Sequence, residues 1–171
     1  MLQKGILAVR GASISLHDVS LKNILSSSET DSSLIELVGS RLRASDSTFS
    51  GVAGNALNLY RSDSAPYSTI EITDSTIEEY GGVGIYSVQA TGTISHSIIS
   101  GGTIGIEHIF SHLRVSNSRI DQHSELGAVA YIPEYPLSAV GNFWGHDSGP
   151  YSEAFNQNAI GDEVSGSVFF E

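Results

Sequence analysis

Residues 70–77 read Ile-Glu-Ile-Thr-Asp-Ser-Thr-Ile, and variants of this pattern recur along the chain at residues 14–21, 42–49, 92–99 and 113–120. Each variant has two alternating apolar positions, then Asp, Asn or His, usually followed by Ser, any residue and an apolar residue. A pattern that recurs at a period of 20–50 residues indicates a repeat fold. The Asp/Asn/His column is Asp18, Asp46, Asp74, His96 and Asn117, with Asn142 expected as a sixth member, in steps of 28, 28, 22, 21 and 25 residues.

Each repeat also contains an earlier alternating segment, with copies near residues 6–9, 34–37, 56–59, 84–87, 105–108 and 128–131. Alternation with a period of two residues predicts strands, and two or three short strands in 21–28 residues suit one turn of a solenoid. Leucine-rich repeats have similar periods, but their Leu-rich consensus is missing, and a hairpin sandwich would leave the repeated register to coincidence. We therefore predict an all-β fold, a right-handed single-stranded parallel β-helix of about six coils stacked about 4.8 Å apart.

Stacking places equivalent residues above one another and predicts three inward rows. These rows are Ile35, Leu57, Ile85, Ile106 and Val129; Leu16, Ala44, Ile72, Ile94, Val115 and Val140; and Leu21, Phe49, Ile77, Ile99 and Ile120. The serines that follow the column should also point inward, namely Ser47, Ser75, Ser97 and Ser118. The column itself should form bends, because Asp and Asn tolerate left-handed backbone. The alternative is a stack of carboxylates, Asp18, Asp46 and Asp74, that binds a cation such as Ca²⁺.

The pattern changes after Ile132, where Pro133 and Pro136 interrupt the strand. We expect one domain over residues 1–171, with coils over about 6–140 and a C-terminal capping segment over about 141–171, and we expect the chain to be a fragment of a longer protein. The cap should cover the open end of the solenoid with aromatic side chains, namely Phe143, Trp144, Tyr151, Phe155, Phe169 and Phe170.

Composition bounds the partners. Eight Lys and Arg against 19 Asp and Glu give a net charge of −11, which disfavours nucleic acid and anionic membrane. There are no cysteines, so the chain has no disulfide, thiolate metal site or cysteine nucleophile. No apolar run approaches the roughly 18 residues of a membrane span, and residues 1–10 do not read as a signal peptide. We expect no cofactor, with Ca²⁺ as the alternative.

The repeated apolar-x-apolar-x-Asn/Asp-Ser units resemble the parallel β-helix repeats of pectin-lyase-like proteins over roughly residues 6–140. Residues 142–145, 148–150 and 161–166 resemble the N-x-W-G…S-G-P…G-x-x-V-S-G segment that closes β-helix regions of large bacterial and archaeal surface proteins. The second resemblance implies an extracellular or cell-surface location. The residue sets that mark polygalacturonase-like hydrolases, pectate-lyase-like enzymes and epimerases in this fold do not occur in the sequence.

The candidate site is the outward row of the first strand. We predict that Glu36, Asn58, Tyr86 and Glu107, followed by Ala130, line this row, where carboxylates, an amide and an aromatic ring suit carbohydrate. In the pectin-lyase-like proteins that the repeats resemble, this face often forms the sugar-binding groove. Glu36 and Glu107 should lie three coils, or about 14 Å, apart, which is too far for a catalytic pair. We therefore predict no catalytic residues.

Histidines suggest no metal site. His108 and His112 have the spacing of a helical zinc pair, but they fall in a strand that leads into a turn.

The predicted function is a non-catalytic stalk or adhesin module with weak glycan binding. The alternatives are a fragment of a polysaccharide lyase or glycoside hydrolase, and an assembly protein that self-associates end to end through its N-terminal coil at residues 6–9.

Overall fold

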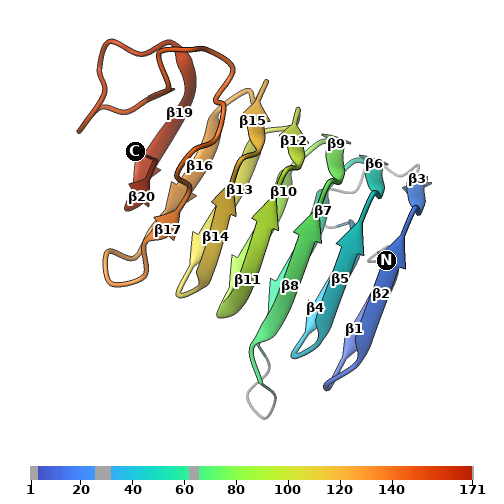
Figure 1. Ribbon diagram of the computed structural model, residues 1–171. Helices are drawn as coiled ribbons and strands as arrows, with labels where there is room; N and C mark the ends of the chain where they lie inside the picture. Colours follow the sequence, from blue (N-terminus) through green and yellow to red (C-terminus); the bar gives the residue numbers. More distant parts are fainter. Residues whose placement is uncertain (1–3, 26–31, 62–65, 171) are drawn as a thin grey trace.

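The computed structural model describes residues 4–25, 32–61 and 66–170, which form twenty β-strands and no helix (Figure 1). Sheet A contains, in spatial order, β1 (Lys4–Val9), β4 (Ser33–Val38), β7 (Asn55–Tyr60), β10 (Val83–Val88), β13 (Ile104–Ile109), β16 (Leu126–Ala130), β19 (Gly161–Gly166) and β18 (Pro150–Tyr151). Sheet B contains β2 (Ser13–His17), β5 (Arg41–Ser45), β8 (Ser68–Thr73), β11 (Ala90–Ser95), β14 (His112–Ser116), β17 (Leu137–Ser138) and β20 (Val168–Phe169). Sheet C contains β15 (Arg119–Asp121), β12 (Ile98–Ser100), β9 (Thr76–Tyr80), β6 (Thr48–Val52) and β3 (Ser20–Leu25).

Successive coils lie side by side along one axis, and each of the first five supplies one strand to each sheet (Figure 1). Every pairing between these strands is parallel. The chain is therefore the parallel β-helix that the repeat predicts. Within the described ranges there is no helix long and apolar enough to cross a lipid bilayer.

The register confirms the inward rows over the central coils. Ile35, Leu57, Ile85 and Ile106 align on successive strands and are fully buried. The row of Phe49, Ile77, Ile99 and Ile120 does the same in sheet C. Because every coil places an apolar side chain at these positions, the core is a continuous column and each coil is stabilised by its two neighbours.

Two assignments near the end of the coils were wrong. Ala128, not Val129, continues the row of Ile106, and Val129 aligns with Glu107 on the outward row, where Ala130 was expected. Residues 127–130 read Gly-Ala-Val-Ala, so the alternation of apolar and polar residues could not show which of them point inward and which point outward. In sheet B, Ala139 is buried where Val140 was expected, and Val140 is 43% exposed.

The Asp/Asn/His column forms bends, as predicted. Its five aligned members all have left-handed backbone, with φ between 49° and 54°: Asp18, Asp46, Asp74, His96 and Asn117. Asn142 is not the sixth member. Gly141, at φ 74°, occupies the bend next to Asn117, since Phe143 pairs with Arg119. Glycine adopts this backbone at no steric cost, which frees Asn142 for a different position.

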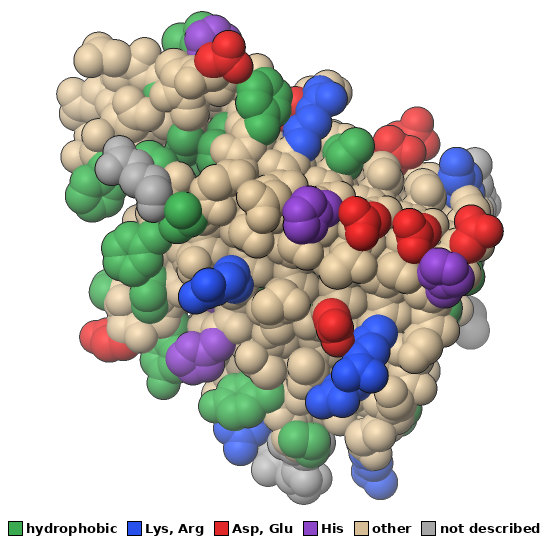
Figure 2. Space-filling model, viewed as in Figure 1, with side chains coloured by type: hydrophobic (Ala, Val, Ile, Leu, Met, Phe, Trp, Pro, Cys, Tyr) green, Lys and Arg blue, Asp and Glu red, His purple; other side chains and the backbone are tan. Residues whose placement is uncertain are grey.

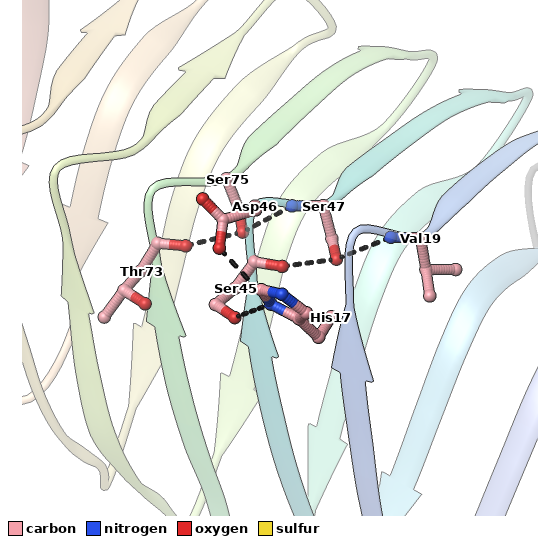
Figure 3. Close-up of polar contacts among 7 residues, drawn as sticks. All are labelled: His17, Val19, Ser45, Asp46, Ser47, Thr73 and Ser75. Atoms are coloured by element: carbon pink, nitrogen blue, oxygen red, sulfur yellow. Dashed lines mark hydrogen bonds and ion pairs between the residues drawn. The ribbon is translucent and has the colours of Figure 1, made fainter.

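A chain of serine hydrogen bonds runs along the axis beside these bends (Figure 3). The Ser47 N–H donates to Ser75 Oγ at 3.1 Å, and Ser75 Oγ donates to the Thr73 carbonyl at 2.7 Å. The same pattern repeats at Ser97 and Ser118. Asn142 ends the chain, because its Oδ1 accepts the Ser118 N–H at 2.9 Å. These buried hydroxyls are thus satisfied, which avoids the roughly 1–3 kcal/mol cost of an unpaired polar group.

The C-terminal segment caps the last coils mainly with backbone strands and one indole ring. Trp144 is 1% exposed and lies over Gly127, where a Cβ would come within 3.1 Å of the ring. Of the other aromatic residues expected in the cap, Phe143, Phe155 and Phe169 are exposed, and Tyr151 and Phe170 are half-buried. Strands β19 and β20 of this segment extend sheets A and B, and of the aromatic residues expected in the cap only Trp144 is buried.

Candidate functional site

Two rows of side chains project outward from the strands of sheet A. The first contains the four predicted residues on successive coils, since Glu36 pairs with Asn58, Asn58 with Tyr86, and Tyr86 with Glu107. The second row lies two residues later in each strand and contains Tyr60 at the end of β7. Tyr131 directly follows β16 and is 53% exposed. We define the tyrosine–glutamate face as Glu36, Tyr60, Tyr86, Glu107 and Tyr131.

Two tyrosine rings of this face are in contact, and the charges of the glutamates act on the tyrosine hydroxyls. The Tyr60 and Tyr86 ring centroids are 5.8 Å apart, edge to face at 64°. Burial, with the nearby charges of Glu36, Tyr86 and Glu107, raises the pKa of Tyr60 to about 12. Burial and then Glu107 raise the pKa of Tyr86 and also that of Tyr131. These phenols therefore keep their protons at neutral pH and can donate hydrogen bonds to a ligand.

Glu107 occupies the middle of the face. It pairs with Tyr86 on one side and with Val129 on the other, and it is half-buried. Burial raises the pKa of its carboxyl group above the ordinary value, because the charged form has lost part of its hydration. A ligand group that donates a hydrogen bond or carries a positive charge would stabilise this carboxylate.

Asn58 plays a different part from its three neighbours in the predicted row. It is 7% exposed, and its Oδ1 accepts a hydrogen bond from Asn55 Nδ2 at 2.9 Å. Asn55 Oδ1 in turn accepts the Val83 N–H at 2.8 Å. Asn58 is therefore tied into the entry to sheet A, while Glu36, Tyr86 and Glu107 are more accessible.

The sequence interpretation missed Tyr60 and Tyr131. The signal was present, because alternation through Leu57-Asn58-Leu59-Tyr60 places Tyr60 outward as well as Asn58. The predicted row contains only one outward position per strand. Tyr131 was missed for the reason already given, since the phase of residues 127–130 could not be read from their composition.

A second polar cluster lies where sheet C meets sheet A. The Tyr80 hydroxyl and His123 Nε2 are 2.7 Å apart, and His123 Nδ1 is 2.7 Å from Asp162 Oδ2. A carboxylate only accepts hydrogen bonds, so His123 Nδ1 donates to Asp162, and in the tautomer whose only ring proton is on Nδ1, Nε2 accepts from the Tyr80 hydroxyl. Burial and then Asp162 and Asp121 raise the pKa of Tyr80. Tyr80 is 3% exposed and the His123 side chain is fully buried, so this cluster joins coils and is closed to a substrate.

Three aligned glycines make room for the rings of Tyr80, His123 and Trp144. A Cβ on Gly84 would lie 2.7 Å from the Tyr80 ring, and one on Gly105 would lie 2.9 Å from the His123 ring. A Cβ on Gly127 would likewise lie 3.1 Å from the Trp144 ring. The rings of Tyr80, His123 and Trp144 therefore cover the first outward positions of β10, β13 and β16. They leave the tyrosine–glutamate face, further along the same strands, as the open part of the sheet.

The bend column is the other candidate site that the sequence raised. Figure 2 shows acidic and histidine side chains in a line across the face of the rod, along the bends that follow the strands of sheet B. His17 Nδ1 lies 3.3 Å from Asp46 Oδ2 and 2.8 Å from Ser45 Oγ (Figure 3). Within residues 4–25, 32–61 and 66–170, no group of three or more His, Asp and Glu could hold a metal ion. The Ca²⁺ alternative stays a prediction.

His108 and His112 do not converge. His112 is exposed at the start of β14, whereas His108 points into the core and is fully buried. Among the described residues, neither ring nitrogen of His108 has a hydrogen-bond partner. Burial lowers the pKa of His108 to about 4, and this effect outweighs the nearby backbone of Ser111 and Tyr135, which favours the charged ring.

This burial predicts acid sensitivity. The unfolded pKa of His108 is 6.5 and the folded value is about 4, so its neutral ring favours the fold above pH 6.5. That contribution is lost as pH falls from 6.5 towards 4, because the unfolded chain binds the proton more readily, and the loss is about 2–3 kcal/mol near pH 4.5. Urea unfolding of His108→Leu and of wild type at neutral pH and near pH 4.5 measures it. The difference between the two pH values should shrink in His108→Leu and persist in His112→Leu, and an equal difference in all three proteins would contradict it.

Comparison with known proteins places the fold. A family profile described as right-handed β-helix region matches residues 33–134, more than half of the chain. No curated protein matches the sequence. Among solved structures, that of trypsin-treated QnrB1, a plasmid-mediated fluoroquinolone resistance protein, is 9% identical, with a TM-score of 0.20 over 96% of this chain and 91% of that chain. A likeness this weak supports no conclusion about fold or function.

Proposed function

The chain belongs to the right-handed β-helix family, and on this premise we propose that it is a non-catalytic module of an extracellular or cell-surface protein. In this proposal the rod is a stalk or adhesin, and its tyrosine–glutamate face binds a glycan. The extracellular location rests on the resemblance of residues 142–166 to the closing segment of surface-protein β-helices.

The observation that supports glycan binding is the grouping of three tyrosines and two glutamates on one sheet. Tyr60, Tyr86 and Tyr131 offer ring faces on which a pyranose can stack, and their protonated hydroxyls can donate to sugar oxygens. Glu107 supplies an acceptor for sugar hydroxyls. The strands beneath are paired on both sides, so the groups are held in place before a ligand arrives, which lowers the entropy cost of binding.

The same geometry argues for binding without turnover. The register separates Glu36 from Glu107 by three coils, or about 14 Å. Glycosidases place their two carboxyl groups about 5–9.5 Å apart, so these two carboxylates do not form such a pair. Tyr86 is no better as a nucleophile, because the pKa of its hydroxyl is raised. This favours the stalk or adhesin over a lyase or hydrolase fragment.

A glycan array, with degradation of polysaccharides followed in parallel and with and without Ca²⁺, tests the proposal. We expect binding without turnover. Tyr86→Ala should weaken that binding about three- to tenfold, because a stacked ring contributes about 0.5–1.5 kcal/mol beyond its buried area. Phe143→Ala is the matched control, since Phe143 is an exposed aromatic residue beside sheet C. Turnover would overturn the non-catalytic proposal, and no binding to any glycan would remove the adhesin part of it.

A further inference from the structure

Glu107 places a carboxylate at the middle of the tyrosine–glutamate face, between Tyr86 and Val129 on the adjacent coils. Glu36 and Glu107 point outward from β4 and β13, and the outward positions of β4, β7, β10, β13 and β16, all of them described, contain no Lys, Arg or His. We infer that this face is selective for a glycan that carries ammonium groups, a polymer of amino sugars without N-acetyl groups, over neutral and uronic-acid glycans. The inference rests on the proposed function and names its ligand class.

Aromatic rings are the first element of this selectivity. The face of a tyrosine ring attracts a cation that lies within about 6 Å of the ring centroid. Tyr60 and Tyr86 lie edge to face with centroids 5.8 Å apart, so the pair fixes both rings and covers one face of one ring. A sugar that stacks on a ring face left open by this contact would gain a cation–π interaction if it carried an ammonium group, where a neutral substituent would gain only contact.

The position of Glu107 is the second element. Glu107 is the register partner of Tyr86 on the next coil, so the two side chains point outward next to each other. An ammonium group held on the Tyr86 ring therefore lies beside the Glu107 carboxylate. Half-burial has removed water from that carboxylate, which strengthens a charge-assisted hydrogen bond formed there.

The spacing of the face suits a chain of sugars. Glu36, Asn58, Tyr86 and Glu107 follow one another on adjacent coils at steps of about 4.8 Å, close to the length of a pyranose unit. A uronic-acid chain that followed this row would bring a carboxylate beside Glu107, where the outward positions of β10, β13 and β16 supply no basic side chain. Like charges at such separations disfavour binding, and the net charge of −11 adds to this effect.

Isothermal titration calorimetry with three hexamers tests the inference, using glucosamine, N-acetylglucosamine and galacturonate units at a pH where the amine is protonated. We expect the glucosamine hexamer to bind about tenfold more tightly than the N-acetylglucosamine hexamer. Its affinity should fall as salt is added, and the galacturonate hexamer should bind most weakly of the three. Equal affinities for glucosamine and N-acetylglucosamine hexamers would overturn the inference and leave the proposed function standing. Tightest binding of the galacturonate hexamer would also overturn the inference and leave the proposed function standing. If no hexamer bound, the result would count against both the inference and the proposed glycan binding.

Glu107→Gln separates a local site from general attraction to an acidic protein. The substitution keeps the side-chain shape and removes the charge, so glucosamine affinity should fall about tenfold. N-acetylglucosamine affinity should fall much less, because the new side chain still offers an amide oxygen to sugar hydroxyls. Glu71→Gln is the matched control, because Glu71 is an exposed carboxylate on sheet B, paired with Arg43 at 2.9 Å. An equal loss of glucosamine affinity in both variants would show nonspecific attraction and overturn the inference.

Discussion

Ile72→Asp is expected to unfold the rod. Ile72 is fully buried in the inward row of sheet B, between Ala44 on one coil and Ile94 on the next. A carboxylate there has no partner and no water, so the loss should exceed about 4 kcal/mol, a large part of the 5–15 kcal/mol that stabilises an ordinary domain. Far-UV circular dichroism and the melting temperature measure the effect.

Thr93→Asp is the control for that experiment. Thr93 lies on the next coil in the same sheet, and its side chain points outward between Glu71 and Arg114. The same new carboxylate at this exposed position should change stability by less than about 1 kcal/mol. Native circular dichroism and an unchanged melting temperature for Ile72→Asp would show that the inward row is assigned incorrectly.

Trp144→Ala should cost about 3–5 kcal/mol of stability, the range observed for removal of a buried Trp or Phe side chain. The indole ring is 1% exposed and fills the space above Gly127. Among the described residues its Nε1 has no hydrogen-bond partner, so the substitution removes packing and no hydrogen bond. The backbone contact from the Asp162 N–H to the Trp144 carbonyl, at 2.7 Å, is unaffected by the change of side chain.

Urea unfolding curves of Trp144→Ala and Phe155→Ala measure the contribution of the cap. Phe155 belongs to the same C-terminal segment but is 74% exposed, so its truncation should change the free energy of unfolding by about 0.5 kcal/mol or less. Similar losses for the two variants would mean that aromatic residues of the cap stabilise the rod collectively. Trp144 would then have no special role as the lid.

The repeat made the fold predictable from the sequence. The bend column identifies the same bend in each coil, because Asp, Asn and His can adopt left-handed backbone. The serine that follows it identifies the position where adjacent coils are joined by a hydrogen bond. Ile72, Ile94 and Val115 could be assigned inward for the same reason, since a parallel stack aligns residues at equal positions in the repeat. The first outward row, with Tyr86 beside Glu107, follows from this alignment.

The rest of the candidate site depends on contacts that local sequence does not encode. Tyr131 joins the face only because Val129 pairs with Glu107, a register that four consecutive small or apolar residues leave open. The partners in the chain of Tyr80, His123 and Asp162 are 43 and 39 residues apart, and no repeat relates them. The sequence alone thus determined the coil, its core and one outward row, because stacking repeats that information on every coil. Tertiary structure decided the final register, the buried cluster and the addition of Tyr131 to the face, because these depend on pairing and contacts between segments that no repeat relates.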